Sequence, residues 1–152
     1  MQKQHCCNNT LYHYFMHYRT AIRILLAILF PVIVFHLLVV AKAIPYNIVW
    51  GGKLQNDAAM YVMECCSISI NLLLVFLLLI KGAYLRAWLK PKIVHRFLWV
   101  FLILFVLNTV GNLFANTLLE KSLAVLTLAS AVLLWYIVRP KTPNNIEPTA
   151  AE

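Results

Sequence analysis

Two ionisable residues, His36 and Glu64, lie well inside long apolar segments of the sequence, where ionisable side chains are rare. A carboxyl group or an imidazole in hydrocarbon costs free energy, so it usually faces a bundle interior, a water-filled path or a partner. These two groups can also exchange a proton, which is the basis of proton relays and of general acid–base catalysis. His36 and Glu64 therefore predict a functional site, provided that their segments bring them together.

Other polar residues accompany these two at helical spacing. The additional candidates for a shared polar pocket are Ser67, Asn71, Asn108, Asn112 and Thr127. Asn71 follows Glu64 by seven residues, which places both on nearly the same side of a helix, with Ser67 between them. Asn112 follows Asn108 by one helical turn. Each set would form a polar stripe on a helix that is otherwise rich in Leu, Ile, Val and Phe.

The segments that must position these residues are apolar runs long enough to cross the ~30 Å hydrocarbon core of a bilayer as helices. We expect four spans, at residues 21–43, 58–80, 94–116 and 121–138. The 152 residues are 62% hydrophobic and 12% charged, with a mean hydropathy of +0.79. A soluble domain of this size could not bury so much apolar surface. The predicted fold is all-α, a transmembrane up-down four-helix bundle.

The distribution of basic residues predicts the orientation of this bundle. Three basic residues flank the spans on one side: Lys42, Lys53 and Lys121. Ten lie on the side of both chain ends: Lys3, Arg19, Arg23, Lys81, Arg86, Lys90, Lys92, Arg96, Arg139 and Lys141. We therefore expect both termini in the cytoplasm and the bundle in the cell inner (plasma) membrane. Cleavage of the first span after Ala43, as in a signal peptide, is the alternative.

Three regions follow from this topology. Residues 1–20 form a cytoplasmic N-terminal segment, and residues 21–139 form the transmembrane domain. Residues 140–152 form a cytoplasmic tail, which is predicted to be disordered because it is rich in Pro, Asn, Thr and Ala. The net charge of +8 lies at the span ends rather than in a patch interleaved with aromatic residues, so we predict no nucleic-acid partner.

Depth matching predicts that the polar residues share one layer. His36 lies seven residues below Ala43 and Glu64 six below Ala58, so both are ~10 Å inside the outer boundary. The third span brings Asn108 and Asn112 to the same depth, and the fourth brings Thr127. The expected result is a polar pocket in the outer half of the bilayer. The alternative is that the Asn residues only join helices through hydrogen bonds.

Three other features of the sequence bear on this pocket or on assembly. The loop residues Trp50, Gly51 and Gly52 could form a lid near the pocket or an ordinary interfacial turn. Cys65-Cys66 lacks C-x-x-C spacing, so we interpret it as small packing side chains rather than a redox site. The small-residue spacing of Gly111 and Ala115 suits a homo- or hetero-oligomer contact. No pattern calls for a metal or a cofactor.

The sequence also resembles a family of small bacterial four-span membrane proteins of unknown function. Three stretches carry the resemblance: Ile44-Pro45-Tyr46 with Trp50-Gly51-Gly52; Glu64 with Ser67-Ile68 and Asn71; and Leu107-Asn108-Thr109-Val110-Gly111-Asn112-Leu113-Phe114-Ala115. The resemblance implies no activity. It implies that the loop, Glu64 and the Asn residues belong together.

Three functions remain open from the residues. The first is a non-enzymatic membrane protein, in contact with lipid, whose pocket around Glu64 binds or moves a small solute or a proton. The second is a structural or accessory subunit in which the polar layer only holds helices together. The third is a membrane-embedded enzyme with Glu64 and His36 as acid and base, and the lack of a further nucleophile or metal ligand set disfavours it.

Overall fold

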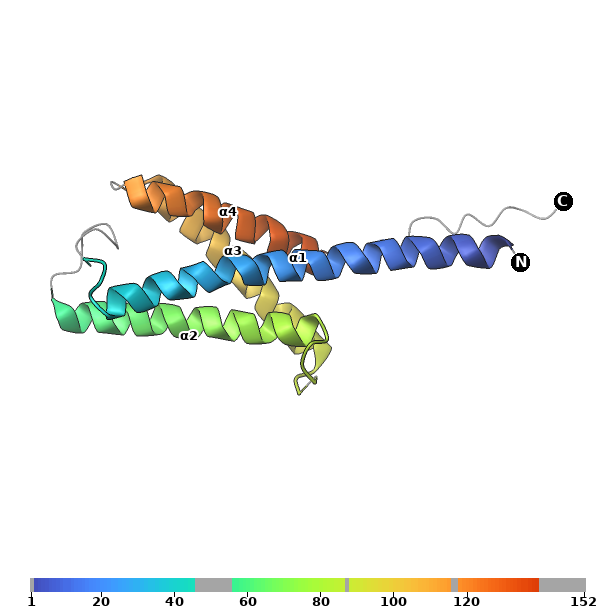
Figure 1. The fold of residues 1–152 in the computed structure, drawn as a ribbon, viewed down its shortest axis with the longest axis horizontal. Coiled ribbons are helices and arrows are strands. Elements are labelled where there is room, and N and C mark those ends of the chain that lie inside the picture. The colour runs from blue at the N-terminus through green and yellow to red at the C-terminus, as the bar shows by residue number, and fades with distance from the viewer. Residues whose placement is uncertain (1, 46–55, 87, 116–117, 140–152) are drawn as a thin grey trace.

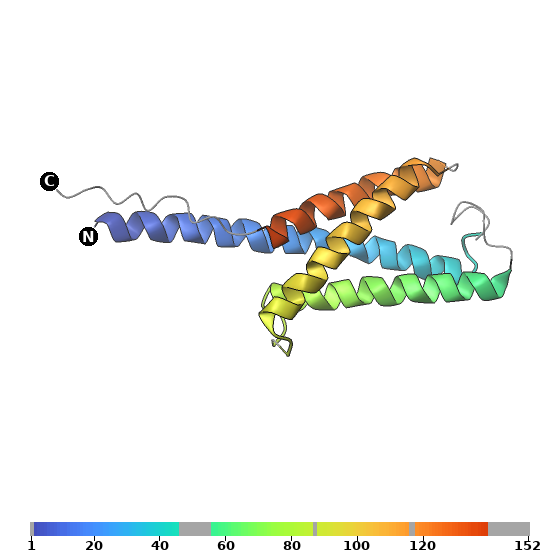
Figure 2. The same cartoon turned by 180° about the vertical axis from the view of Figure 1, so that it is seen from behind.

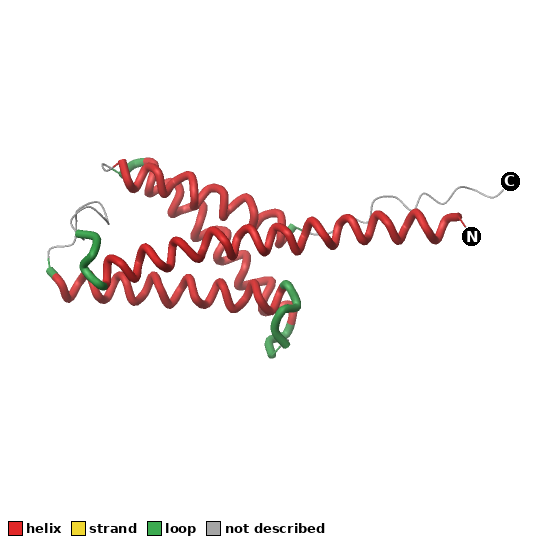
Figure 3. Tube along the Cα trace, viewed as in Figure 1, coloured by secondary structure: helices red, strands yellow, loops and turns green. Residues whose placement is uncertain are grey.

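The computed structural model describes residues 2–45, 56–86, 88–115 and 118–139, and the secondary structure in these ranges is helical. The helices are α1 (Gln2–Val40), α2 (Asp57–Lys81), α3 (Pro91–Leu113) and α4 (Leu118–Val138) (Figures 1 and 3). All contain a segment long and apolar enough to cross a bilayer: Tyr18–Val40, Asp57–Lys81, Pro91–Leu113 and Lys121–Val138. The predicted all-α, four-helix transmembrane bundle is confirmed. The chain is a multi-pass integral membrane protein that contacts lipid through these apolar helices.

Local chemistry determines where these helices begin and end. The side chain of Asn56 caps α2, with its Oδ1 accepting a hydrogen bond of 2.7 Å from the amide of Ala59. Pro91 starts α3, because the first helical position needs no amide donor. After α1, Lys42 adopts the left-handed conformation (φ 58°), which turns the chain out of the helix.

The helices form two antiparallel pairs, α1 with α2 and α3 with α4 (Figures 1 and 2). The seam between α1 and α2 repeats every three or four residues, as in a coiled coil. The buried residues of this seam are Ile22, Leu25, Leu29 and Val39 from α1, with Met60, Glu64, Leu74 and Leu78 from α2. Both helices place a polar side chain, His36 and Glu64, at positions that this repeat otherwise assigns to apolar residues.

The pair α3–α4 packs through small side chains of α4. Ala124, Thr127, Ser130 and Ala131 are buried, which lets the backbone of α3 approach closely. Nearer the end of α4, the rings of Trp99 and Trp135 meet edge to face, with centroids 5.7 Å apart.

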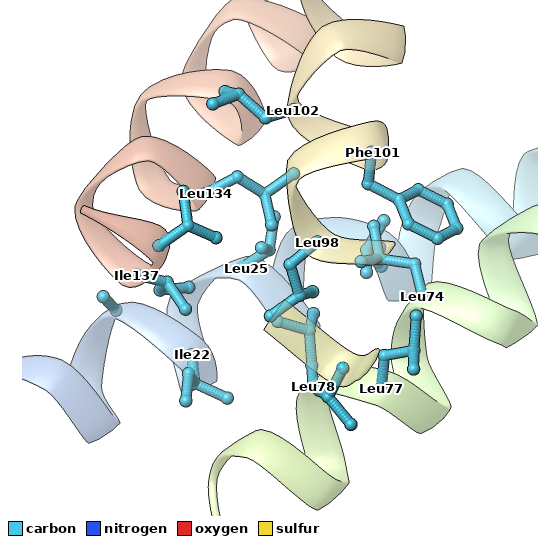
Figure 4. Packing of buried hydrophobic residues seen from close by; sticks show 14 of the residues in the cluster. Ile22, Leu25, Leu74, Leu77, Leu78, Leu98, Phe101, Leu102, Leu134 and Ile137 are labelled. Atoms are coloured by element: carbon cyan, nitrogen blue, oxygen red, sulfur yellow. The ribbon is translucent and has the colours of Figure 1, made fainter. Parts of the chain in front are cut away.

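The two pairs share one hydrophobic core, and it lies at only one end of the bundle. Figure 4 shows its central residues, which come from all four helices: Ile22, Leu25, Leu74, Leu77, Leu78, Leu98, Phe101, Leu102, Leu134 and Ile137. We call this end the basic end, because Arg19, Arg23, Arg86 and Arg96 lie there. Toward the opposite end, which we call the Asp57 end, the pairs diverge in a V (Figures 1 and 2).

Helix α1 extends beyond the bundle at the basic end (Figure 1). The predicted N-terminal segment is thus, from Gln2 onward, a helical continuation of the first span. The helix also continues through Pro31, whose ring is exposed.

Candidate functional site

His36 and Glu64 meet across the α1–α2 seam. Nδ1 of His36 lies 2.6 Å from Oε2 of Glu64, which is a short hydrogen bond or, with a protonated imidazole, an ion pair. The two residues come from antiparallel helices and lie at the same depth, as the sequence predicts. The ring of Phe35 lies edge-on to the imidazole, with centroids 5.9 Å apart.

Apolar clusters enclose this polar pair along the seam on both sides. Toward the Asp57 end, Val39 and Met60 are fully buried and form a small cluster with Phe35, Ile44 and Ala59. Toward the basic end lies the shared four-helix core. As a result, the Glu64 side chain is 1% exposed, whereas that of His36 is 17% exposed. The imidazole is the more accessible member of the pair.

A second, exposed pair marks the Asp57 end of the same seam. Nζ of Lys42 lies 2.5 Å from Oδ2 of Asp57, and the ammonium group is also 5.8 Å from the ring centroid of Tyr61. Both charged side chains are about half exposed, at 49% and 51%. Asp57, Tyr61 and Glu64 follow one another at four- and three-residue spacing on α2, so the three side chains lie on one face of this helix.

The polar stripe of α2 continues inward from Glu64. Ser67 and Asn71 are half-buried, and Nδ2 of Asn71 donates to the carbonyl of Ser67 over 2.8 Å. This bond stays within α2, so it satisfies one donor of the side-chain amide without bridging two helices.

A further polar contact joins α3 to α4. Oγ1 of Thr109 and Oγ1 of Thr127 are 2.9 Å apart, and both hydroxyls also lie within hydrogen-bond distance of carbonyls of their own helices. Thr127 was expected in the pocket of Glu64. Its contacts instead lie within the other helix pair. Thr109 was not predicted, although its position between two Asn residues was a signal in the sequence.

Asn108 and Asn112 of α3 lie at helical positions close in phase to Phe101, which packs in the shared core. Asn108 follows Phe101 by seven residues, and the ring of Phe101 lies on the α2 side of α3 in the core (Figure 4). Beyond the core the pairs separate, so Asn108 is exposed and Asn112 is half-buried. The structure therefore brings His36 to Glu64 and Thr127 to Thr109, and it leaves Asn108 exposed.

Comparisons with protein-family models, curated proteins and solved structures gave no match.

The remaining sequence candidates are placed as follows. Trp50, Gly51 and Gly52 lie outside the described residues. Cys65 and Cys66 are free and exposed, so their interpretation as packing residues is wrong: adjacent helical positions point about 100° apart, and Glu64 already occupies the buried position. Among the described side chains, no three His, Cys, Asp or Glu residues are grouped to hold a metal ion.

Proposed function

We propose that this protein binds an exchangeable proton at His36 and Glu64, and that it acts as a non-enzymatic membrane protein that handles protons or a small solute. The observation that supports this is the 2.6 Å contact between an imidazole and a carboxyl group that is 1% exposed. A charged carboxyl group in hydrocarbon is costly. Proton exchange with a neighbouring imidazole therefore decides whether the carboxyl group carries a charge.

The different exposures of the two side chains suggest a route for the proton. Val39 and Met60 cover the path along the seam from the Asp57 end, while 17% of the His36 side chain is accessible. A proton would thus reach Glu64 through the imidazole, whose two nitrogens can accept on one side and donate on the other. A buried carboxyl group offers almost no surface to a substrate, which favours this role over that of an enzyme.

The proposal also includes the orientation of the protein in the membrane. With ten basic residues at one end of the spans and three at the other, we infer that the basic end is cytoplasmic and that the Asp57 end faces outward, in a bacterial inner membrane. Single cysteines placed at Lys53 and Lys90 in a cysteine-free background test this orientation. A membrane-impermeant maleimide should label the first from outside and the second only after permeabilisation.

Infrared spectroscopy of the protein in vesicles tests proton binding directly. Stepping the external pH should change a carboxylic acid C=O band that Glu64→Gln removes and that His36→Gln shifts. Asp57→Asn is the matched control, because Asp57 is an exposed carboxylate on the same helix and its loss should leave that band in place. A band assigned to Glu64 that does not respond to pH would defeat the proposal.

The structural role is the second candidate, and the Thr109–Thr127 contact favours it. This bond joins α3 to α4 at 2.9 Å without an ionisable group, so polar contacts in this bundle can serve assembly alone. Glu64→Gln separates the two roles, since glutamine keeps a hydrogen bond to His36 but holds no exchangeable carboxyl proton. Full retention of the protein's cellular role by this variant would favour the structural function.

A further inference from the structure

Two arginines at the basic end are held in place by one tyrosine. Arg19 and Arg23 are one turn apart on α1, so their side chains lie on the same face. Nε of Arg23 donates to the hydroxyl of Tyr84 over 2.9 Å, and the guanidinium of Arg19 lies 5.8 Å from the centre of the same ring. These contacts link α1 to the connection between α2 and α3.

The backbone of that connection is shaped to hold the tyrosine. A Cβ on Gly82 would lie 2.6 Å from the Tyr84 ring, so only glycine leaves room for it. The next residue, Ala83, has a φ of 57°, a left-handed conformation that non-glycine residues rarely adopt. Basic residues that only set topology need no such arrangement.

The charge at this end has little acidic counterpart in the sequence. Residues 1–56 and 65–119 contain no Asp or Glu, whereas they contain ten of the 13 basic residues. Eight of these ten flank the spans on the side of the basic end: Lys3, Arg19, Arg23, Lys81, Arg86, Lys90, Lys92 and Arg96. A guanidinium presents five N–H donors in a planar fork that suits phosphate oxygens, and the bond to Tyr84 uses one donor of Arg23.

Apolar side chains beside these cations indicate a lipid rather than a soluble anion. Trp88 is 86% exposed and Leu85 is 44% exposed in the same connection, with the exposed Arg86 between them. An exposed Trp next to basic residues is typical of the membrane interface, where its ring sits at headgroup level. A phospholipid would satisfy both features at once.

We propose that Arg19, Arg23 and Tyr84 form a binding site for the phosphate group of an anionic phospholipid, with Leu85 and Trp88 against its acyl chains. The site does not depend on the proton-binding role of Glu64. It differs from general attraction of a basic surface to anionic lipids, because it requires guanidinium geometry and not charge alone.

Charge-conserving variants of the full chain test this. In an uncharged detergent, short-chain phosphatidylglycerol should raise the Tm of the native protein, and phosphatidylcholine of the same chain length should not. Arg19→Lys with Arg23→Lys keeps the charge but should weaken the apparent affinity about tenfold, since a charged hydrogen bond is worth about 1.5 kcal/mol. The control, Lys90→Arg with Lys92→Arg, should bind like the native chain.

Tyr84→Phe provides a second variant that keeps the ring and all charges. It should also weaken phosphatidylglycerol binding, because Arg23 loses its hydroxyl partner. Native affinity in both the double arginine variant and Tyr84→Phe would overturn the proposal. Equal stabilisation by inorganic phosphate would overturn the assignment to a lipid.

Discussion

Nδ1 of His36 and Oε2 of Glu64 lie 2.6 Å apart at the α1–α2 seam, where the coiled-coil repeat would otherwise place two apolar side chains. Either residue alone would leave a polar group buried between helices. Together they satisfy part of each other's hydrogen-bonding capacity, and this mutual dependence can be measured.

A double-mutant cycle should show strong coupling between the two residues. His36→Leu and Glu64→Leu should each destabilise the protein by about 1–3 kcal/mol, because each leaves its partner buried without this hydrogen bond. The double variant should lose less than the sum of the single losses. Unfolding in mixed micelles with dodecyl sulfate gives the free energies. Ser69→Ala is the control, because its exposed hydroxyl bonds only the carbonyl of Cys65 among the contacts described.

The contact between Thr109 and Thr127 should behave as an independent unit. Thr127→Val should cost about 1 kcal/mol, the usual value of an interhelical hydrogen bond in membranes. Combined with Glu64→Leu, its effect should add within about 0.5 kcal/mol, because the two contacts lie in different helix pairs. The same unfolding titration measures both. A large departure from additivity would mean that the two polar contacts form one network.

The two described glycines should respond oppositely to alanine. Gly82→Ala should destabilise the protein by about 1–3 kcal/mol, since the new Cβ would lie 2.6 Å from Tyr84. Gly111→Ala should be neutral or stabilising by up to about 1 kcal/mol, because nothing lies within 4 Å of its Cβ and alanine favours a helix.

The Gly111 variant also tests the predicted oligomer contact. If copies associate through Gly111 and Ala115, the added methyl group should weaken their cross-linking in membranes even though the monomer is no less stable. Unchanged cross-linking would exclude these two residues from such a contact.

The salt dependence of stability should distinguish the roles of Asn56 and Asp57 at the start of α2. Asn56→Ala removes the helix cap and should cost about 1 kcal/mol at any ionic strength. Asp57→Asn breaks an exposed ion pair with Lys42, so its cost should stay below about 1 kcal/mol and shrink as salt is added. Unfolding at low and high salt compares them, and a salt-dependent loss in Asn56→Ala would contradict the capping role.

The sequence predicted the spans closely because hydrocarbon imposes a length on them. The second span was expected at residues 58–80 and is Asp57–Lys81. The third was expected at residues 94–116 but is Pro91–Leu113, because proline is well suited to a first helical turn. Depth in the membrane was also enough to anticipate the contact of His36 with Glu64.

The remainder of the polar layer could not be predicted in the same way. Helical phase gives the face on which Asn108 lies, but not the distance to the helix opposite. That distance depends on how the side chains of two pairs pack, and here the shared core ends near Phe101 and Leu102. The partner of Thr127 was missed for a related reason, since an interior Thr can bond its own helix or a neighbour equally well.

The presence of one polar contact inside each helix pair has a consequence for biogenesis. A helical hairpin that enters the bilayer with its polar groups already bonded to each other exposes little unsatisfied polarity to lipid. The hairpin of α1 and α2 can hide Glu64 behind His36, and that of α3 and α4 can join Thr109 to Thr127, before the two hairpins meet. Insertion as two ready-made halves, followed by their docking through the apolar core, is the assembly order that this architecture favours.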